Sequence, residues 1–528
     1  MTSTALDAPS VVEPDAGVRA ARARGLRVAA ALGSGVTVAL CFPPADLGPL
    51  VLVALVPLLW AWRGARPAAA AGYGFLFGVA CYGLTIEWIR YFGVVAFVAL
   101  VGAMAAAIAV VGVLVALLGR RGLTSPVFVA AAWVLLEALR GRWPLGGFPW
   151  CDLGVTLHDV PAARALASFG GTLLVSFVIV LVNGYLLDLA VAARRRRGRM
   201  AAGAATALVV VIVLTAAADA ARFVPTVTGH LRVAVLQGDD RELPLAQQLD
   251  QRLTTTYLRL ADRLHGRDDL VVFPESALDT NPETDPALRR RLVAIAAAHD
   301  ASLLVNARRH RRGGGLFNTN FLYEPDGHLQ GTYAKQHLVP FGEYVPWRSS
   351  LGFLPQLRDI PYDFRAGHTQ RVFHVAGHRV ATVVCFESAF APLVRDAVRD
   401  GAEMLVVSTN NRSYRRSANS EQHLALAQMR AAETARPVVQ ASLSGMSAVV
   451  DASGDVHDRT GLFETAIVRA SVATTTGETP YVRYGDWIVV LSAALLLGAA
   501  IVVTVRAPRR GGPDARATTT SGPSRGGA

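Results

Sequence analysis

Long apolar runs occupy the chain before residue 223, and one more lies near the C-terminus. A helix needs about 20 consecutive, mostly apolar residues to cross the hydrocarbon core of a bilayer. We therefore expect about eight membrane-spanning helices, about seven of them within residues 26–222 and the last at 486–505. The apolar segments are 26–42, 48–62, 68–88, 91–118, 124–139, 166–192, 200–222 and 486–505. Residues 1–25 and 506–528 are polar and are expected to be disordered cytoplasmic tails.

Every second connection between these segments contains arginines, which lie close to the ends of the apolar runs. Basic residues are enriched in cytoplasmic loops, so the alternation predicts that both termini lie in the cytoplasm. Residues 223–485 would then lie on the outer face of the cytoplasmic membrane. The loop at 140–165 would lie on the same side, with Trp143 and Trp150 anchoring it at the membrane interface. The arginines concerned are Arg19, Arg22, Arg24, Arg27, Arg63, Arg66, Arg120, Arg121, Arg194, Arg195, Arg196, Arg197, Arg199, Arg506, Arg509 and Arg510.

Between residues 223 and 485, short runs rich in β-branched residues alternate with longer amphipathic runs. The short runs predict strands and the longer runs predict helices. Such alternation indicates an α/β domain whose sheets are covered by helices. The predicted strands are 231–236, 270–273, 302–305, 317–323, 371–375, 379–384, 404–408, 438–442, 447–451 and 466–472, and the predicted helices are 245–264, 286–299, 391–400 and 420–435.

The composition agrees with a membrane protein. Hydrophobic residues make up 52% of the 528 residues and charged residues only 17%, which is too apolar for a soluble multidomain protein. The net charge of +12 reflects arginines that lie beside the apolar segments, so we expect no nucleic-acid partner. The cysteines, at positions 41, 81, 151 and 385, form no CxxC pair, so neither a disulfide framework nor a metal site is expected. We expect no cofactor either.

Lys335 is the only lysine among the 52 Lys plus Arg residues. An ammonium is a compact donor whose pKa responds to burial, whereas a guanidinium is planar and stays charged. Held near a reacting carbonyl, Lys335 could stabilise a developing oxyanion. The alternative is that codon usage left one lysine by chance, and the lysine alone does not decide between the two.

Two predicted strands end close to groups that could react. The run 270–273 is followed closely by Glu275, and the run 380–384 leads directly to Cys385. A side chain at the end of a core strand is rigidly held and open to a cleft. Cys385 is the only cysteine in the predicted α/β domain. It is either a small buried apolar residue or a nucleophile that a base such as Glu275 activates.

Three motifs together resemble the nitrilase, or carbon–nitrogen hydrolase, superfamily. They are Phe-Pro-Glu at 273–275, the stretch Tyr333–Pro346, and Val-Cys-Phe-Glu at 384–387. The resemblance implies an α-β-β-α sandwich with a Glu-Lys-Cys triad. The stretches Glu421–Glu433 and Ser444–Ser447, together with the eight-span layout, are similar more specifically to the apolipoprotein N-acyltransferase family. This likeness covers about residues 26–505.

By motif position, the resemblance implies that Cys385 is the nucleophile, Glu275 the general base and acid, and Lys335 the donor that stabilises the tetrahedral intermediate. Five further positions match residues around the family's site and are expected to support the triad or bind substrate: Glu343, Glu387, Asn318, Phe386 and Tyr333. The chain departs from the family at Asn411–Tyr414, within a run that is often Asn-Asp-x-Trp-Phe, and at Phe386, where Tyr is frequent. The triad is intact despite these departures.

The resemblance implies an acyltransferase of the bacterial cytoplasmic membrane with its catalytic domain on the outer face. Cys385 would take an acyl chain from a membrane phospholipid as a thioester and pass it to the α-amine of the diacylglyceryl-modified cysteine of an apolipoprotein. The apolar connector 351–357 would be a lid or a packed link. Two alternatives stay open: a membrane-anchored amidase that uses the same triad on a soluble amide, and a membrane scaffold without catalysis. A transporter fits poorly, because the spans carry few charged residues.

Overall fold

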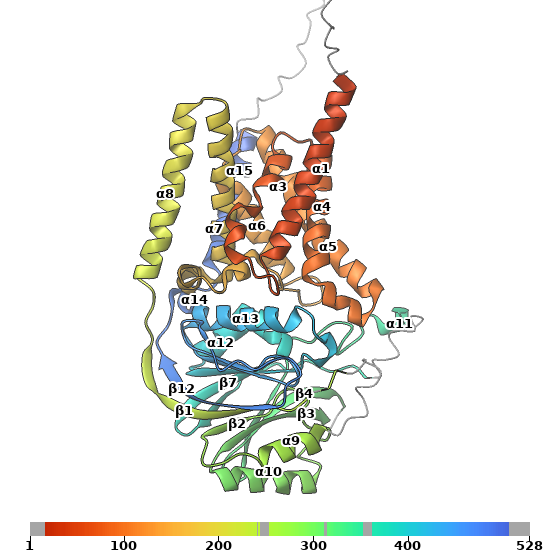
Figure 1. Ribbon diagram of the computed structural model, residues 1–528, viewed down its shortest axis with the longest axis vertical. Helices are drawn as coiled ribbons and strands as arrows, with labels where there is room; N and C mark the ends of the chain where they lie inside the picture. The colour runs from red at the N-terminus through yellow and green to blue at the C-terminus, as the bar shows by residue number, and fades with distance from the viewer. Residues whose placement is uncertain (1–15, 240, 243–252, 311–313, 352–361, 506–528) are drawn as a thin grey trace, which may run out of the picture.

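The computed structural model describes residues 16–505, apart from residue 240 and the segments 243–252, 311–313 and 352–361 (Figure 1). A bundle of helices forms one end of the molecule, and two β-sheets with their covering helices form the other (Figure 1). Most of the two predicted tails, and most of the apolar connector 351–357, therefore lie outside the described residues.

The helical end of the molecule is the first part, and the end with the two sheets is the second part. The helices of the first part overlap the eight predicted apolar segments. They are α1 (Ala16–Leu40), α2 (Val51–Ala54), α3 (Val56–Trp62), α4 (Pro67–Thr85), α5 (Val94–Arg120), α6 (Pro126–Arg140), α7 (Pro161–Arg194), α8 (Gly198–Ala220) and α15 (Trp487–Val505). Four of them, α4, α5, α7 and α8, are long and apolar enough to cross a membrane. Among the described residues the apolar helices at 48–62 and 487–503 are shorter, so the eight spans stay a prediction.

Helix α1 begins earlier than the apolar pattern predicts. Residues 16–25 are expected to belong to a disordered tail, but they form the first turns of α1. The tail prediction is wrong for this stretch. Alanine and arginine have high helix propensity, so they extend a helix that the following apolar run has already nucleated.

Helix α7 is interrupted at Gly170 and Gly171, whose backbone angles are non-helical. Gly171 has a φ of +73°, which glycine adopts at little cost. At this break the carboxylate of Glu433, from the second part, accepts hydrogen bonds from the backbone N–H (2.6 Å) and the hydroxyl (2.5 Å) of Thr172. The single apolar segment predicted at 166–192 therefore contains a docking point for the second part of the molecule.

The second part consists of two facing six-stranded sheets, in the orders β12-β1-β2-β3-β4-β5 and β11-β10-β9-β8-β7-β6. Their central strands run parallel, β1-β2-β3 in one sheet and β7-β8-β9 in the other. Helices α9 and α10 cover the first sheet, and α12 and α13 cover the second on the side of the helical part (Figure 1). The predicted α-β-β-α sandwich is thus confirmed. The bounds are β1 (Thr226–Gln237), α9 (Leu253–Ala261), β2 (Leu270–Val272), α10 (Pro286–His299), β3 (Ser302–His310), β4 (Leu316–Tyr323), β5 (Leu329–Ala334), α11 (Arg348–Leu351), β6 (Val372–Val375), β7 (His378–Val384), α12 (Ala391–Arg399), β8 (Met404–Thr409), α13 (Asn419–Thr434), β9 (Val438–Ser442), β10 (Ala448–Val450), β11 (Val456–His457), β12 (Ala466–Thr476) and α14 (Pro480–Tyr484).

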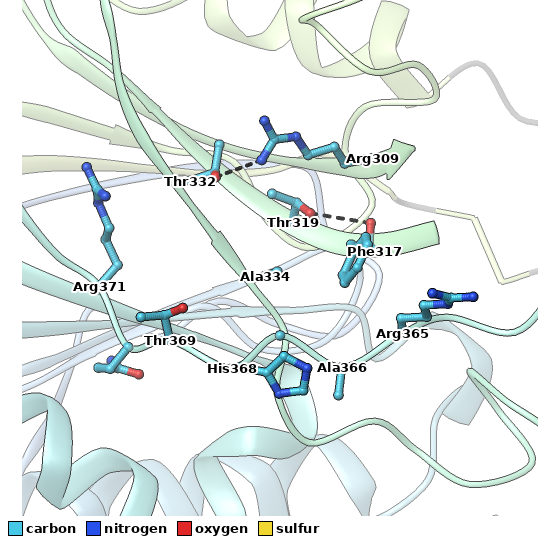
Figure 2. A pocket seen from close by; sticks show the side chains of 12 residues that line it. Arg309, Phe317, Thr319, Thr332, Ala334, Arg365, Ala366, His368, Thr369 and Arg371 are labelled. Carbon is cyan, nitrogen blue, oxygen red and sulfur yellow. Dashed lines mark hydrogen bonds between the residues drawn. The ribbon is translucent and has the colours of Figure 1, made fainter. Parts of the chain in front are cut away.

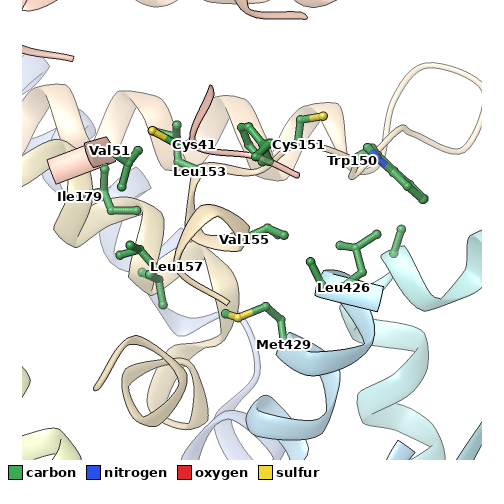
Figure 3. Close-up of a cluster of buried hydrophobic side chains, with 14 of the residues drawn as sticks. Cys41, Val51, Trp150, Cys151, Leu153, Val155, Leu157, Ile179, Leu426 and Met429 are labelled. Atoms are coloured by element: carbon green, nitrogen blue, oxygen red, sulfur yellow. The ribbon is translucent and has the colours of Figure 1, made fainter. Parts of the chain in front are cut away.

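Apolar side chains form three buried clusters. One lies between the two sheets, and a second lies between the first sheet and helices α9 and α10. The third runs without interruption from α12 and α13 into the helical part. Figure 3 shows a portion of it, where Leu426 and Met429 of α13 lie near Val155 and Leu157 of the short helix η3 (Leu153–Leu157). The two parts of the molecule therefore share one core, which stabilises their relative position.

Each predicted strand overlaps an observed strand, and the predicted helix 245–264 is described only from 253 as α9. The sequence pattern missed β5, although this strand leads to Lys335. Its residues Leu-Gln-Gly-Thr-Tyr-Ala do not alternate between apolar and polar, and a glycine weakens its strand propensity. Pairing with β4 decides its conformation.

Candidate active site

The three groups of the predicted triad lie at the carboxyl ends of strands. Glu275 follows β2, Lys335 follows β5, and Cys385 follows β7 as the first residue of the short helix η6 (Cys385–Ala389). β5 runs in the same direction as β2, because it is separated from the parallel strands by two antiparallel pairings. The residues Glu275, Lys335 and Cys385 are 5%, 1% and 7% exposed. The fold therefore brings these three groups together in a buried place.

Lys335 lies between two carboxylates. Its Nζ is 3.0 Å from Oε1 of Glu343 and 3.5 Å from Oε1 of Glu275. Asn318 donates from its Nδ2 to the same two oxygens, at 2.7 Å to Glu275 and 3.1 Å to Glu343. Glu343 is held in turn by the backbone N–H of Val339 at 2.8 Å. Asn318 and Glu343 thus orient the ammonium and the carboxylate of Glu275 toward each other.

The charges of this group favour a protonated lysine. Burial by itself lowers the pKa of Lys335, but the carboxylates of Glu343 and Glu275 outweigh it and hold that pKa well above its usual value. Burial also raises the pKa of Glu275, while the charge of Lys335 opposes that shift. A carboxylate with a raised pKa is suited to accept and return a proton near neutral pH.

Cys385 is a thiol rather than a thiolate in the resting site. Burial raises its pKa to about 12, and the negative charge of Glu275 adds to the shift. The other oxygen of Glu275, Oε2, accepts a hydrogen bond from the backbone N–H of Asn410 at 2.9 Å. Cys385 also has a left-handed backbone, with φ of +51°, which is uncommon for a residue with a side chain. Such local strain is concentrated at functional sites.

Glu387 ties the Lys335 segment to the Cys385 turn. Its carboxylate accepts backbone hydrogen bonds from Val384 (2.7 Å), Gln336 (2.6 Å) and His337 (3.1 Å). The hydroxyl of Tyr333 donates to both of its oxygens, at 3.0 and 2.9 Å. Glu387 is fully buried, and burial raises its pKa to about 7 while the three backbone donors act in the opposite direction. Its role is therefore to connect two loops that are far apart in the sequence.

His423 of α13 supports the same turn, although it is not among the site residues that the sequence predicts. Its Nε2 lies 3.1 Å from the carbonyl oxygen of Cys385 and 2.8 Å from the hydroxyl of Ser388, while its Nδ1 lies 3.3 Å from Nδ2 of Asn411. Burial lowers the pKa of His423 to about 4, so the ring is neutral and can donate through Nε2 and accept through Nδ1. The one indication of this role in the sequence is that His423 lies within the motif Glu421–Glu433.

Phe386 points away from the triad, toward the helical part. Its ring stacks on Phe148 (5.9 Å between centroids) and Trp150 (6.3 Å), and meets Phe390 edge-on at 5.0 Å. Trp150 is only 3% exposed, so the prediction that it anchors the loop at the membrane interface is wrong. Packing against the sandwich buries it instead, whereas Trp143 of the same loop is exposed.

A cavity of about 560 Å³ lies on the other side of β5 (Figure 2). Thr332 and Ala334 line it, and they alternate along the strand with Tyr333 and Lys335. Because successive side chains of a strand point to opposite faces, this cavity is separated from the triad by the sheet. Its other lining residues include three arginines, one of which, Arg309, donates to the hydroxyl of Thr332 at 2.9 Å (Figure 2).

Asp46, His158 and Asp159 form the one group among the described residues whose side-chain atoms are close enough to share a metal ion. His158 lies 3.0 Å from Asp46 through Nε2 and 2.8 Å from Gln428 through Nδ1. Burial opposes its protonation, but Asp159 and Asp46 raise its pKa to about 9. His158 thus pairs with two carboxylates and contacts Gln428 of α13, so the group links the two parts of the molecule.

Comparisons with known proteins agree with this arrangement. Residues 34–185 match the family model of the apolipoprotein N-acyltransferase N-terminal domain, and residues 232–481 match that of the carbon–nitrogen hydrolases. The apolipoprotein N-acyltransferase of Geobacter metallireducens is 31% identical over 496 residues, covering 90% of this chain and 94% of the relative. That of Gloeobacter violaceus is 33% identical over 506 residues, covering 92% and 95%.

Among solved structures, an amidase of the nitrilase superfamily from Nesterenkonia AN1 is 19% identical, with a TM-score of 0.36, and the match covers 52% of this chain and 99% of the amidase. The two family models cover most of the helices from α1 to α7 and most of the sandwich, and the relatives extend across the junction between them. The chain therefore belongs to the apolipoprotein N-acyltransferase family of the carbon–nitrogen hydrolase superfamily.

Proposed function

We propose that this protein transfers a fatty acyl chain from a membrane phospholipid to the α-amine of the diacylglyceryl-modified N-terminal cysteine of apolipoproteins, through a thioester on Cys385. The observation that carries the proposal is the buried group of Cys385, Glu275 and Lys335, which lies beside a core shared with the membrane helices. A soluble amidase with the same reactive groups has no need of such a core. The enzyme class of the relatives agrees with it.

In the first half-reaction, Glu275 accepts the proton of the Cys385 thiol, and the sulfur attacks an ester carbonyl carbon of the phospholipid. The carbonyl oxygen becomes an oxyanion, which the ammonium of Lys335 stabilises. When this intermediate collapses, the bond to the glycerol oxygen breaks, and Glu275 returns its proton to that oxygen. A lysophospholipid leaves, and Cys385 keeps the acyl group as a thioester.

In the second half-reaction, the amine of the apolipoprotein attacks the thioester carbonyl, and Glu275 accepts a proton from the nitrogen. Lys335 again stabilises the oxyanion, the carbon–sulfur bond breaks, and the thiolate is reprotonated from Glu275. The product is an N-acylated lipoprotein. Burial of the three groups excludes bulk water, so the amine competes with little hydrolysis.

We further propose that the sandwich lies on the outer face of the bacterial cytoplasmic membrane. The alternation of arginine-rich connections supports this orientation, because arginines are concentrated on the cytoplasmic side. The acceptor would then meet the enzyme after export. The eight membrane spans belong to the same proposal, and four helices with the required length and composition support it.

The test is the intact mass of the purified protein after incubation with phospholipid alone. Wild type should gain the mass of one fatty acyl group, which hydroxylamine removes, and Cys385→Ala should gain none. If folded wild-type protein gains no acyl group from any of a range of phospholipids, the proposed donor is wrong. Hydrolysis of small soluble amides without lipid would then favour the membrane-anchored amidase, and inactivity toward both would favour the scaffold.

A further inference from the structure

Helix α13 separates the second sheet from the helical part, and Gln422 is the residue through which it contacts four segments of that part. Its Oε1 accepts hydrogen bonds from the indole N–H groups of Trp88 (3.1 Å) and Trp150 (2.8 Å). Its Nε2 donates to the carbonyl oxygens of Pro43 (3.2 Å) and Thr85 (2.9 Å). Gln422 is only 3% exposed, so water does not replace these partners.

These four hydrogen bonds use the full capacity of the amide, which has two donor hydrogens and one acceptor oxygen with two lone pairs. The four partners come from different places: the connection after α1, the end of α4, the short helix η2 (Glu87–Phe92), and the loop after α6. One side chain thus fixes four loop ends against α13. Losing it would leave two buried indole donors and two buried carbonyls without a partner, which is unfavourable in a place that water does not reach.

The next residue of α13 contacts the backbone of the turn that carries Cys385. His423 contacts the carbonyl oxygen of Cys385 at 3.1 Å, so neighbouring residues of one helix hold the membrane loops and the catalytic turn. The two indoles meet edge-on, with centroids 5.5 Å apart, and Trp150 stacks on Phe386, which follows Cys385 directly. Gln422 therefore orients Trp88 and Trp150, the indoles that lie between the helical part and the turn of Cys385.

We propose that Gln422 is a positioning residue, which holds Trp88 and Trp150 so that an acyl chain arriving from the membrane side presents its carbonyl carbon to Cys385. This inference rests on the proposed function only in taking Cys385 as the nucleophile. Gln422 does not touch the reacting atoms. The turnover of a substrate without a long acyl chain should therefore not depend on Gln422.

The test compares two esters that release p-nitrophenol. One is p-nitrophenyl palmitate in detergent micelles, and the other is p-nitrophenyl acetate in water. Gln422→Met preserves the length of the side chain and removes all four hydrogen bonds. It should lower kcat/KM for the palmitate by about tenfold or more, because a long acyl chain that is bound out of place presents its carbonyl carbon poorly to Cys385. It should change kcat/KM for the acetate by less than about threefold, because Cys385, Glu275 and Lys335 are unaltered.

Gln422→Glu provides a second variant. Its carboxylate keeps the acceptor for both indoles but places an oxygen against the carbonyls of Pro43 and Thr85. Its loss on the palmitate should be smaller than that of Gln422→Met if orientation of the indoles is what matters. A greater loss than that of Gln422→Met would show that the carbonyl contacts dominate, and would overturn the role assigned to the indoles.

Gln440→Met is the matched control for burial and chemistry. Gln440 is fully buried in β9 and donates to the carbonyl oxygen of Met446, within the sandwich. Its substitution should affect the two esters equally. An equal loss on both esters for Gln422→Met, or the same selective loss for Gln440→Met, would overturn the inference. Wild-type protein that hydrolyses both esters but takes no acyl group from phospholipid would refute the proposed donor alone.

Discussion

Replacing Glu387 by glutamine tests whether the Lys335 segment and the Cys385 turn form one unit. The carboxylate accepts hydrogen bonds from the backbone N–H groups of Val384 and Gln336 at 2.7 and 2.6 Å, with further donors at both oxygens. A glutamine amide retains one acceptor oxygen and turns the other into a donor. In the less costly orientation the amide oxygen keeps the hydrogen bonds from Gln336 and His337. The NH₂ group then faces the backbone N–H of Val384, which loses its acceptor, and the hydroxyl of Tyr333 rotates to accept a hydrogen bond from the NH₂ group.

The cost follows from these partners. One buried backbone donor loses its acceptor, and the remaining bonds lose their charge assistance, which together destabilise the fold by about 2–4 kcal/mol. For a domain of this size, that lowers Tm by roughly 4–16 °C. Val384 directly precedes Cys385, and Gln336 directly follows Lys335, so a shift of about 1 Å between them should slow thioester formation about 100-fold.

The assays are thermal unfolding in detergent and the time course of acyl-enzyme formation by intact mass. Tyr333→Phe is the matched control, because it removes one donor and leaves all three backbone bonds to Glu387. It should cost about 1 kcal/mol and less than about tenfold in rate. A Glu387→Gln variant with wild-type Tm and rate, or a Tyr333→Phe variant that is equally impaired, would refute the reasoning.

The other predictions concern the triad and the residues around it. Lys335→Arg should slow thioester formation by about 100-fold or more, because a planar guanidinium cannot place its charge where Nζ lies; a rate within tenfold of wild type would contradict this. Alkylation of Cys385 should slow as the pH falls through the raised pKa of Glu275, since the protonated carboxyl cannot accept the thiol proton, and Glu275→Gln should remove this pH dependence. The pKa of His423 falls from 6.5 to about 4 on burial, so the folded state should lose roughly 3 kcal/mol as the pH drops from 6.5 to 4. Unfolding of His423→Gln measured across that range should lack this contribution. Tyr414→Phe restores the more frequent aromatic at that position and keeps the ring packed on its neighbours at 4.9 Å and 5.3 Å, so activity should stay within about twofold of wild type.

Much of the architecture follows from local patterns in the sequence. The apolar runs predict where the helices of the first part lie, and alternating segments predict the strands of the sandwich. Local patterns also place Glu275 and Cys385 at strand ends, because a strand and its end are defined by neighbouring residues. Lys335 stands out by its rarity, although no local pattern predicts the strand that leads to it.

What the sequence by itself determined was therefore the order of elements and which polar groups stand at the ends of the strands. Only the tertiary structure decided which of them meet. The contacts of Gln422 with Trp88 and Trp150 join residues 334 and 272 positions apart, and no local pattern records such pairs. The same packing buries Trp150 and turns Phe386 away from the triad. Hydrophobic periodicity reports that a face is buried but not what covers it, and the covering is selected by the packing of the whole chain.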